Sequence, residues 1–490
     1  MRLHDGHSAS RNLLQPTGSL GALRLLAGAA AALLGGMVAI SLADASDFRA
    51  APFIVGVGGF VLLAVSLRLP MTLVFAVILY ESLLSWQEAS QIAVLGYNRL
   101  LYYAVMVGGF SMAVVGSAIL RRRRVALTWV DVTLVLYLAA AGLSTRASVD
   151  PATARPGLTY LAAGALCIYT VRLTIRTQAH KRQVLAFLLG FMVFEGLLGA
   201  FQFVTRQGLL YTFFESGADL VPRAPGTLGN GLGWYLSVGY ILAFNLWLYS
   251  RTRTQAWLFA IVTASIAIGL IASNTRGSWV DCAIATVLSL LPALRARPRR
   301  ALSIVAMAGA VVLIALTSSL LRGRVESIVG QVNDPIGNTF GFRLYMWRAA
   351  VDMFGANPLV GVGPDNFKPL MPNYADDEGR VALHLDRGAT YNVHHAGLQV
   401  LAETGIVGGA AYALFVAAFV GQAWRVCRAL KDTDRGWGMA LLVFALTSTL
   451  SMIYGGYAYG GYTQIGRLYF VLVGLTLAQA NMLQRTRRSV

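Results

Sequence analysis

The sequence predicts an all-α polytopic membrane protein with about 12 to 14 transmembrane helices, 14 being favoured, and one large polar segment between them. Two observations carry this prediction. Of the 490 residues, 56% are hydrophobic and only 13% are charged, and the mean hydropathy is +0.61. The apolar residues also gather in runs of about 20, the length that crosses a bilayer as a helix. A soluble domain of this length does not need so much apolar surface, so we expect lipid around most of the chain.

The apolar runs form two groups, separated by a short polar stretch after residue 205. In a 12-span arrangement the two shortest runs would form half-spans or a hairpin. The candidate spans lie near residues 20–43, 52–67, 70–86, 100–120, 127–144, 157–173, 183–205, 228–249, 255–272, 277–294, 301–320, 397–424, 437–455 and 462–483. The first run is too long for the apolar core of a signal peptide, so we interpret it as a retained span.

The positions of Lys and Arg indicate how the spans are oriented. With 14 spans, most basic residues fall in short loops on one side, including the run Arg121–Arg124. Short basic loops face the cytoplasm, so both termini are predicted to be cytoplasmic and the long polar segment to face outward. The net charge of +18 then reflects topology and anionic headgroups rather than nucleic acid.

We expect three parts along the chain. Residues 1–320 would hold about eleven spans, residues 321–396 a periplasmic loop region with short amphipathic helices, and residues 397–490 about three spans. The three cysteines, scattered over different apolar runs, show no metal-ligand spacing and no disulfide framework.

Within the polar segment, "GFRLYMWRAAVDMF" (341–354) has a helical pattern. Asn357-Pro358 should end this helix, and "GVGPDNF" (361–367) should form a turn. The residues expected to share one face of the helix are Leu344, Trp347, Ala350, Val351 and Phe354.

Three polar features lie on the predicted outer face. Arg276 stands in "SNTRGSW" (273–279) between two spans, Arg343 and Arg348 lie on the loop helix, and His394-His395 precede the next span. Each has a bland explanation: an arginine snorkelling to the interface, the solvated face of an amphipathic helix, and a polar helix entry. Adjacent histidines diverge on a helix and no third ligand has usable spacing, so a metal site is not favoured.

Together these residue types suit one kind of chemistry. Arginines can hold a diphosphate through bidentate hydrogen bonds, and an imidazole can take a proton from an attacking hydroxyl. This describes transfer of a group from a lipid diphosphate to an alcohol. A transporter of anionic lipids would need similar parts, but it would also need ionisable residues along its spans. Only Glu195 and Glu403 lie inside predicted spans as candidates for such a path.

Three motifs in order resemble those of bacterial O-antigen ligases and the related O-antigen polymerases. "HHAGLQVLAETGIVGG" (394–409) is similar to the family's H-N/S/Q-x9-G-x-x-G motif, with His394 at the histidine position and Leu398, Leu401, Glu403, Gly405 and Gly408 in register. "SNTRGSW" resembles its S-x-S/T-R-G element. Residues 342–367 resemble its R-x3-W-x3-A…P-x-x-G-x-G-x-x-N/F stretch. The resemblance covers residues of about 230 to 410.

The resemblance implies a GT-C-like, inverting and metal-independent glycosyltransferase without a cofactor. It would move O-antigen polysaccharide from undecaprenyl diphosphate to a lipid A-core hydroxyl, at the periplasmic face of the bacterial inner membrane, in lipopolysaccharide biosynthesis. Carried over by position, Arg276 and Arg343 would hold the diphosphate, and His394 would be the general base or would orient the acceptor. The alternatives within the family are an O-antigen polymerase and a protein O-oligosaccharyltransferase.

Two points stay open at this stage. The position after the family histidine is normally Asn, Ser or Gln and is His395 here, so either imidazole could be the base, although the register favours His394. "VPRAPGTLGNGLGWY" (221–235) has glycines that would allow close helix packing. We therefore count Arg223, Arg348 and His395 as second-tier substrate-binding candidates.

Overall fold

A computed structural model describes residues 127–206, 222–306, 339–431, 434–454 and 464–488, with the pair 215–216 and a few residues between 71 and 119. The predicted spans before residue 121, and most of the one near 301–320, lie outside the described residues. The long helices are α6 (Trp129–Arg146), α7 (Pro151–Thr174), α8 (Gln178–Thr205), α9 (Leu232–Leu248), α10 (Arg253–Ser273), α11 (Arg276–Ala296), α14 (Thr339–Ala356), α17 (Ala396–Ala429), α18 (Arg435–Tyr454) and α19 (Gln464–Arg488).

Each predicted span that falls on the described residues coincides with one of these helices, with boundaries that differ by up to about six residues. Six helices of the described part are long and apolar enough to cross a membrane: α7, α8, α10, α11, α17 and α18. Helix α9 is also apolar but shorter. The chain is therefore a multi-pass, mainly helical protein. The total of 14 spans and the GT-C-like fold remain predictions.

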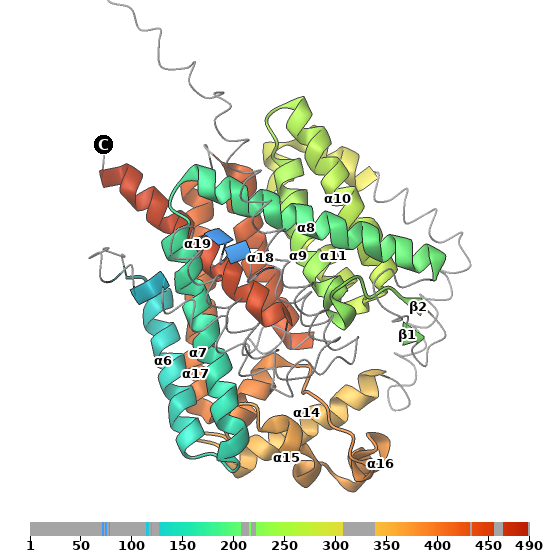
Figure 1. Cartoon of the computed structure of the whole chain (residues 1–490), viewed down its shortest axis with the longest axis vertical. Coiled ribbons are helices and arrows are strands. Elements are labelled where there is room, and N and C mark those ends of the chain that lie inside the picture. The colour runs from blue at the N-terminus through green and yellow to red at the C-terminus, as the bar shows by residue number, and fades with distance from the viewer. Residues whose placement is uncertain are drawn as a thin grey trace, which may run out of the picture.

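Short elements connect the helices at one end of the bundle. The polar segment adds α15 (Phe367–Tyr374), α16 (Asp377–Ala382) and the turn η4 (Leu385–Arg387). Before α9 lie the turn η3 (Gly229–Gly231) and a two-residue antiparallel pair, β1 (Glu215–Ser216) with β2 (Pro222–Arg223). In Figure 1 the helices α14, α15 and α16 lie together below the long helices, at the foot of α6, α7 and α17.

A buried ion pair joins three helices at the other end. Arg172 of α7 and Asp131 of α6 are almost fully buried, with 2.6 Å between guanidinium Nη1 and carboxylate Oδ1. The hydroxyl of Tyr169 also donates to this carboxylate, over 2.9 Å. The second guanidinium nitrogen lies 3.4 Å from Asn481 Oδ1 of α19. Two buried charges with several hydrogen bonds fix how α6, α7 and α19 meet.

The direction of each helix follows from contacts at its ends. A Cβ added at Gly436, at the start of α18, would lie 3.2 Å from the carbonyl oxygen of Asn245 near the end of α9. Because a short connection joins α17 to α18, α9 and α17 finish at the same end and run in the same direction. The N–H of Ala224, just before α9, donates to the carbonyl of Ala272 in α10 over 3.1 Å. The starts of α9, α11 and α17 therefore share one end of the bundle.

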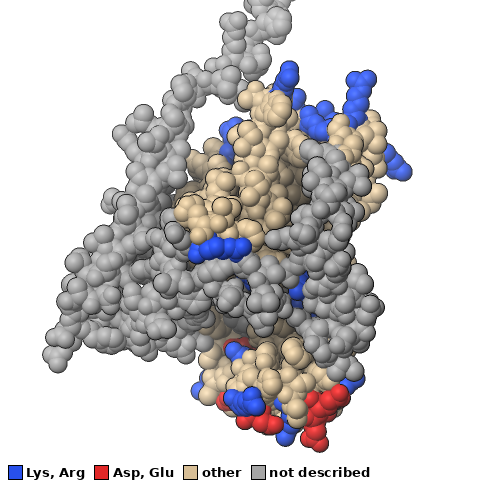
Figure 2. Space-filling model, turned by 90° about the vertical axis from the view of Figure 1, so that its right-hand side faces the viewer, with Lys and Arg blue, Asp and Glu red and all other residues tan. Residues whose placement is uncertain are grey.

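Charge is distributed unequally between the two ends. On the face in Figure 2, Lys and Arg gather at the upper end without visible Asp or Glu, whereas both signs occur at the lower end. Exposed arginines in the loops at the ends of α9, α10 and α11 contribute to the basic end: Arg251, Arg253, Arg295, Arg297 and Arg299. This asymmetry has the direction expected from the sequence, and the cytoplasmic position of that end stays a prediction.

Helix α14 forms as expected, but its buried side only partly coincides with the face predicted from the sequence. The buried apolar side chains of α14 are Tyr345, Met346, Ala349, Ala350 and Met353, so Ala350 is the one member of that face that is fully buried, and Val351 is 52% exposed. The buried stripe is turned by about one residue, or 100°. The reason is the partner surface: α14 packs on Phe367, Met371, Leu383 and Leu385 of the elements that follow it. Hydrophobicity alone did not reveal which side these elements would cover.

Candidate functional site

The two histidines lie in a tight turn between α14 and α17. His394 has a positive φ of 54°, in the left-handed region that few residues other than glycine adopt. On one side of it, the side chain of Val393 is fully buried, and its carbonyl oxygen accepts a hydrogen bond from the indole Nε1 of Trp347 over 3.0 Å. On the other side, α17 begins at Ala396. The backbone of His394 is therefore held at both ends.

His395 is the N-cap of α17. Its Nδ1 atom accepts a hydrogen bond from the backbone N–H of Leu398 over 3.1 Å, which satisfies one of the unpaired amides at the helix start. Its ring also meets the ring of Trp347 edge to face, with 5.5 Å between the centroids. Burial lowers the pKa of His395, which favours the unprotonated Nδ1 that the cap requires. Its side chain is thus engaged in the start of the helix.

His394 is partly buried and lies near Arg343 of α14. Burial, and then the positive charge of Arg343, lower the pKa of His394 to about 4. An imidazole with this pKa is neutral near pH 7 and can accept a proton. Because Arg343 acts on His394 through space, the structure brings together two of the residues singled out in the sequence, from segments about fifty residues apart.

Arg348, one turn after Arg343, has different surroundings. Its guanidinium is exposed, lies 3.6 Å from the carboxylate of Asp376 and stands over the ring of Tyr345. These contacts hold it on the outer surface of α14 to α16. None of its described contacts is with His394, so a role in binding substrate remains an untested expectation.

Arg276 is the first residue of α11 and directly follows the two-residue connection from α10. Trp234 of α9 packs against this start of α11, because a Cβ added at Gly277 would lie 2.5 Å from its ring. The indole of Trp279 donates back to the carbonyl of Leu270 over 2.9 Å. The position of Arg276 is therefore fixed by α9 and α10, at the end of the bundle that also carries His394.

Arg223 is exposed and immediately precedes Ala224, which contacts the end of α10 near the same connection. It pairs with Glu215 in the two-stranded ladder, and the following residue, Ala224, donates to Ala272 of α10. The loop after it is held on α8, since the N–H of Gly226 donates to Gln202 Oε1 over 2.8 Å. Close approach is seen at two of these glycines: a Cβ at Gly226 would meet the carboxylate of Glu195 and one at Gly233 the side chain of Thr275, whereas a Cβ at Gly229 would meet nothing within 4 Å.

The candidates thus form two groups at one end of the bundle. The first is Arg343 with His394, and the second is Arg276 with Arg223. Residues 307–338 and 455–463, which follow α11 and α18 in the chain, are not among the described residues.

Helix α17, which begins directly after the histidine turn, is broken at Gly405. Gly405 has φ 63° and ψ −166°, so the helix is interrupted one residue after Thr404. The loop after α14 fills the gap: the N–H groups of Val362 and Gly363 donate to the freed carbonyls of Ala402 and Glu403, over 3.1 and 2.8 Å. The loop with the glycine motif at 361–363 is therefore hydrogen-bonded to the break in α17 beside the glycine motif at 405–408. Both motifs are visible in the sequence, but their contact is not.

The two glutamates considered for a transport path have local partners. The carboxylate of Glu195 accepts hydrogen bonds from the N–H and hydroxyl of Thr227. The carboxylate of Glu403 accepts from the side-chain amide of Gln399 over 3.1 Å. Both side chains hold segments of the fold together, which does not favour a transport path through them.

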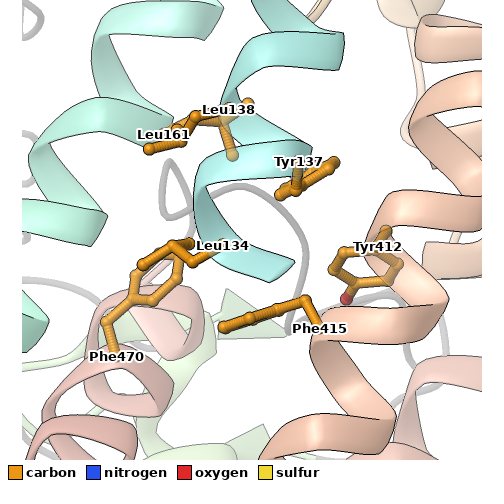
Figure 3. A pocket seen from close by; sticks show the side chains of 7 residues that line it. All are labelled: Leu134, Tyr137, Leu138, Leu161, Tyr412, Phe415 and Phe470. Atoms are coloured by element: carbon orange, nitrogen blue, oxygen red, sulfur yellow. The ribbon is translucent and has the colours of Figure 1, made fainter. Parts of the chain in front are cut away.

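A small apolar pocket lies away from this site (Figure 3). It is bounded by α6, α7, α17 and α19, and Tyr412 in its wall is about four turns along α17 from the histidines. No charged side chain lines it, so it offers nothing to a diphosphate. Its lining residues are Leu134, Tyr137, Leu138, Leu161, Tyr412, Phe415 and Phe470.

In the part of the chain that the structure describes, no three His, Cys, Asp or Glu side chains gather closely enough to hold a metal ion. Metal independence stays a prediction, to be tested with a chelator.

Two comparisons with known proteins bear on this site. The sequence profile described as O-antigen ligase matches residues 258–413, which include Arg276, Arg343, His394 and His395 but not Arg223. A curated relative, the exopolysaccharide production protein ExoQ of Rhizobium meliloti (strain 1021), is 25% identical over 334 residues, covering 66% of this chain and 72% of the relative.

Proposed function

We propose that this chain is an O-antigen ligase, and the match of residues 258–413 to the O-antigen ligase profile supports the proposal. It would transfer polysaccharide from undecaprenyl diphosphate to a hydroxyl of the lipid A core. The reaction would take place at the periplasmic face of the inner membrane, in lipopolysaccharide biosynthesis, with inversion and without a metal. The observation that carries the proposal is the neutral, partly buried imidazole of His394 beside Arg343, within the segment that matches the family.

In this proposal His394 takes the proton of the acceptor hydroxyl. The hydroxyl oxygen attacks the anomeric carbon from the side opposite the diphosphate, the new C–O bond forms, and the bond from carbon to the diphosphate oxygen breaks. The leaving diphosphate keeps the electron pair and develops negative charge. Arg343 and Arg276 would hold that charge through bidentate hydrogen bonds.

The lowered pKa of His394 keeps its imidazole neutral at pH 7. One ring nitrogen is then unprotonated and can receive the proton of the acceptor hydroxyl. The capping bond of His395 supports the same assignment, because its Nδ1 is engaged with Leu398. Asn and Ser, two of the residues expected at this position by resemblance, are also strong N-caps, so His395 would replace them in a structural role.

The position of Arg276 is compatible with this division of labour. It stands at the N-terminus of α11, where backbone N–H groups and the helix dipole favour an anion. The same end of the bundle carries His394. The donor diphosphate would therefore lie between the start of α11 and the histidine turn.

A second candidate function is favoured by the match to ExoQ, whose name refers to exopolysaccharide production. In that case the acceptor would be a second lipid-linked glycan, and the chain would be a polymerase with the same donor and the same residues. A protein hydroxyl is the third acceptor type within the family resemblance. The alternatives differ in acceptor only, so one assay with several acceptors separates them.

The test uses purified protein, undecaprenyl-diphosphate-linked glycan and EDTA. Parallel reactions contain lipid A core, a second lipid-linked glycan, or an acceptor protein. Transfer to lipid A core in chelator supports the ligase, and elongation of the lipid-linked glycan supports the polymerase. Activity that requires added Mg²⁺ contradicts metal independence. No product with any acceptor would exclude glycan transfer and turn attention to transport.

A further inference from the structure

The indole of Trp347 holds the backbone on which His394 stands. We propose that Trp347 is a positioning residue, whose N–H fixes the Val393 carbonyl and thereby keeps the His394 ring beside Arg343. The inference rests on the proposed function, in which His394 takes the acceptor's proton. It adds a residue that touches neither substrate nor the reacting atoms.

The first support is the arrangement on α14. Arg343 and Trp347 are four residues apart, so their side chains lie on the same face of the helix, one turn from each other. The indole Nε1 lies 3.0 Å from the carbonyl oxygen of Val393. Arg343 acts electrostatically on the next residue, His394. One face of α14 therefore supplies both the hydrogen bond to Val393 and the positive charge that acts on His394.

The second support is the strained backbone of His394. A residue with a side chain costs free energy when its backbone φ is 54°, and this conformation persists only where the surroundings impose it. Three contacts impose it here. Val393 is fully buried among side chains of α14 to α16, its carbonyl is bonded to Trp347, and His395 is fixed as the cap of α17.

The third support is the contact between the two rings. Trp347 meets His395 edge to face at 86°, so one indole touches the backbone before His394 and the ring after it. Loss of the indole N–H would free the Val393 carbonyl and let the turn relax. The neighbouring groups described around His394 are Arg343 and His395, and no carboxylate is among the causes of its lowered pKa.

The experiment compares Trp347→Phe and Trp347→His with Trp437→Phe. Phe keeps an aromatic ring and removes the N–H, whereas His keeps a ring N–H. Trp437 is the matched control, since it is a buried indole that donates over 3.1 Å to Gln479 in the opposite half of the bundle. For each purified protein, kcat and the KM for lipid-linked donor are measured. The pH dependence of carbethoxylation of His394 is read by mass spectrometry in a His395→Asn background.

We expect Trp347→Phe to lower kcat about 10- to 100-fold with donor KM changed less than about threefold, because misplacing a catalytic group costs rate more than binding. Trp347→His should recover part of the loss. Carbethoxylation requires the neutral imidazole, so the profile of His394 should move from near pH 4 towards the ordinary value of about 6.5 in Trp347→Phe. Trp437→Phe should leave kcat and the profile unchanged.

The positioning role is overturned if Trp347→Phe keeps the wild-type kcat and the wild-type titration of His394. It is also overturned if Phe and His variants lose equal activity, because ring packing alone would then explain the loss. Should wild type transfer no glycan at all, the proposed function fails, and the carbethoxylation profile alone decides. If the carbethoxylation profile of His394 shifts in Trp347→Phe, the positioning role of Trp347 is still supported. If the profile does not shift, that role is excluded.

Discussion

The imidazole Nδ1 of His395 accepts a hydrogen bond from the backbone N–H of Leu398, over 3.1 Å, and so closes the first turn of α17. Its neighbour His394 makes no such cap and instead stands in a left-handed turn near Arg343. Two adjacent histidines thus have different tasks. The functional predictions about this site start from that difference.

Replacing His395 by Asn should preserve both folding and glycan transfer, because the Asn side chain is also a good N-cap. His395→Ala should lower the free energy of unfolding by about 1 kcal/mol, the usual cost of losing a cap, and should still be active. Thermal unfolding in detergent and the transfer assay measure both effects. His394→Ala should be inactive at near wild-type stability, with His180→Ala at the opposite end as control. An inactive His395→Asn would move the base to position 395.

The pH profile of transfer should have its acid limb near pH 4. A base works only when neutral, so activity is present above the folded pKa of His394, about 4, and is lost as the pH falls through it. Removing a positive neighbour raises that pKa. In Arg343→Gln the limb, normalised to its plateau, should therefore move upward. A wild-type limb near 6.5 would contradict the assigned surroundings of His394.

Gly405→Ala should destabilise the protein strongly. The added Cβ would lie 2.3 Å from the carbonyl carbon of Leu359, and φ is positive there, so the strain of about 1 to 3 kcal/mol adds to a backbone clash. Gly421→Ala in the same helix is the matched control, because its Cβ meets nothing within 4 Å. That change should be neutral or stabilising by up to about 1 kcal/mol. Equal unfolding temperatures for the two variants would disprove the close contact between the loop after α14 and the break in α17.

Asp131→Ala should cost more stability than the double variant with Arg172→Met. The single change leaves the fully buried guanidinium of Arg172 without its carboxylate, at a cost of about 3 to 5 kcal/mol. The double change removes both charges. Unfolding curves of the two single variants and the double give the coupling energy. Additive effects would mean that the ion pair contributes no specific interaction.

Arg276→Lys should raise the donor KM at least about tenfold if Arg276 grips a diphosphate, because lysine cannot form the bidentate contact. Arg253→Lys, at the exposed start of α10 in the opposite half, is the control and should bind donor normally. Titration with a lipid diphosphate lacking the glycan reports binding without turnover. Equal affinities for the wild type and Arg276→Lys would favour the alternative interpretation, in which Arg276 is an interfacial arginine without a role in binding.

Much of the helical framework could be predicted from the sequence. Runs of apolar residues mark α7, α8, α10, α11, α17 and α18, because a segment buried in lipid must satisfy its own backbone and so becomes a helix. The end of α14 before Pro358 and the turn at 361–367 were also readable from local chemistry. The buried face of α14 was not, since it depended on where α15 and α16 would pack.

For the candidate site, too, some features could be predicted from the sequence and others could not. The motifs marked His394, Arg343 and Arg276, and local spacing indicated that His394 and His395 stand before a helix. Which imidazole caps that helix depended on the actual geometry of the turn, and therefore on Trp347, about fifty residues earlier in the chain.

The sequence by itself determined the multi-pass helical class, the positions of the long helices that the structure describes and the residue types available for chemistry, because hydrophobicity and local backbone preferences act over one turn or one span. Only the tertiary structure decided that Arg343 lies beside His394, that His395 is a cap, and that Gly405 breaks α17 to receive the loop after α14. These relations join segments distant in the chain, and their free energy comes from packing and hydrogen bonds that exist only once the helices have met.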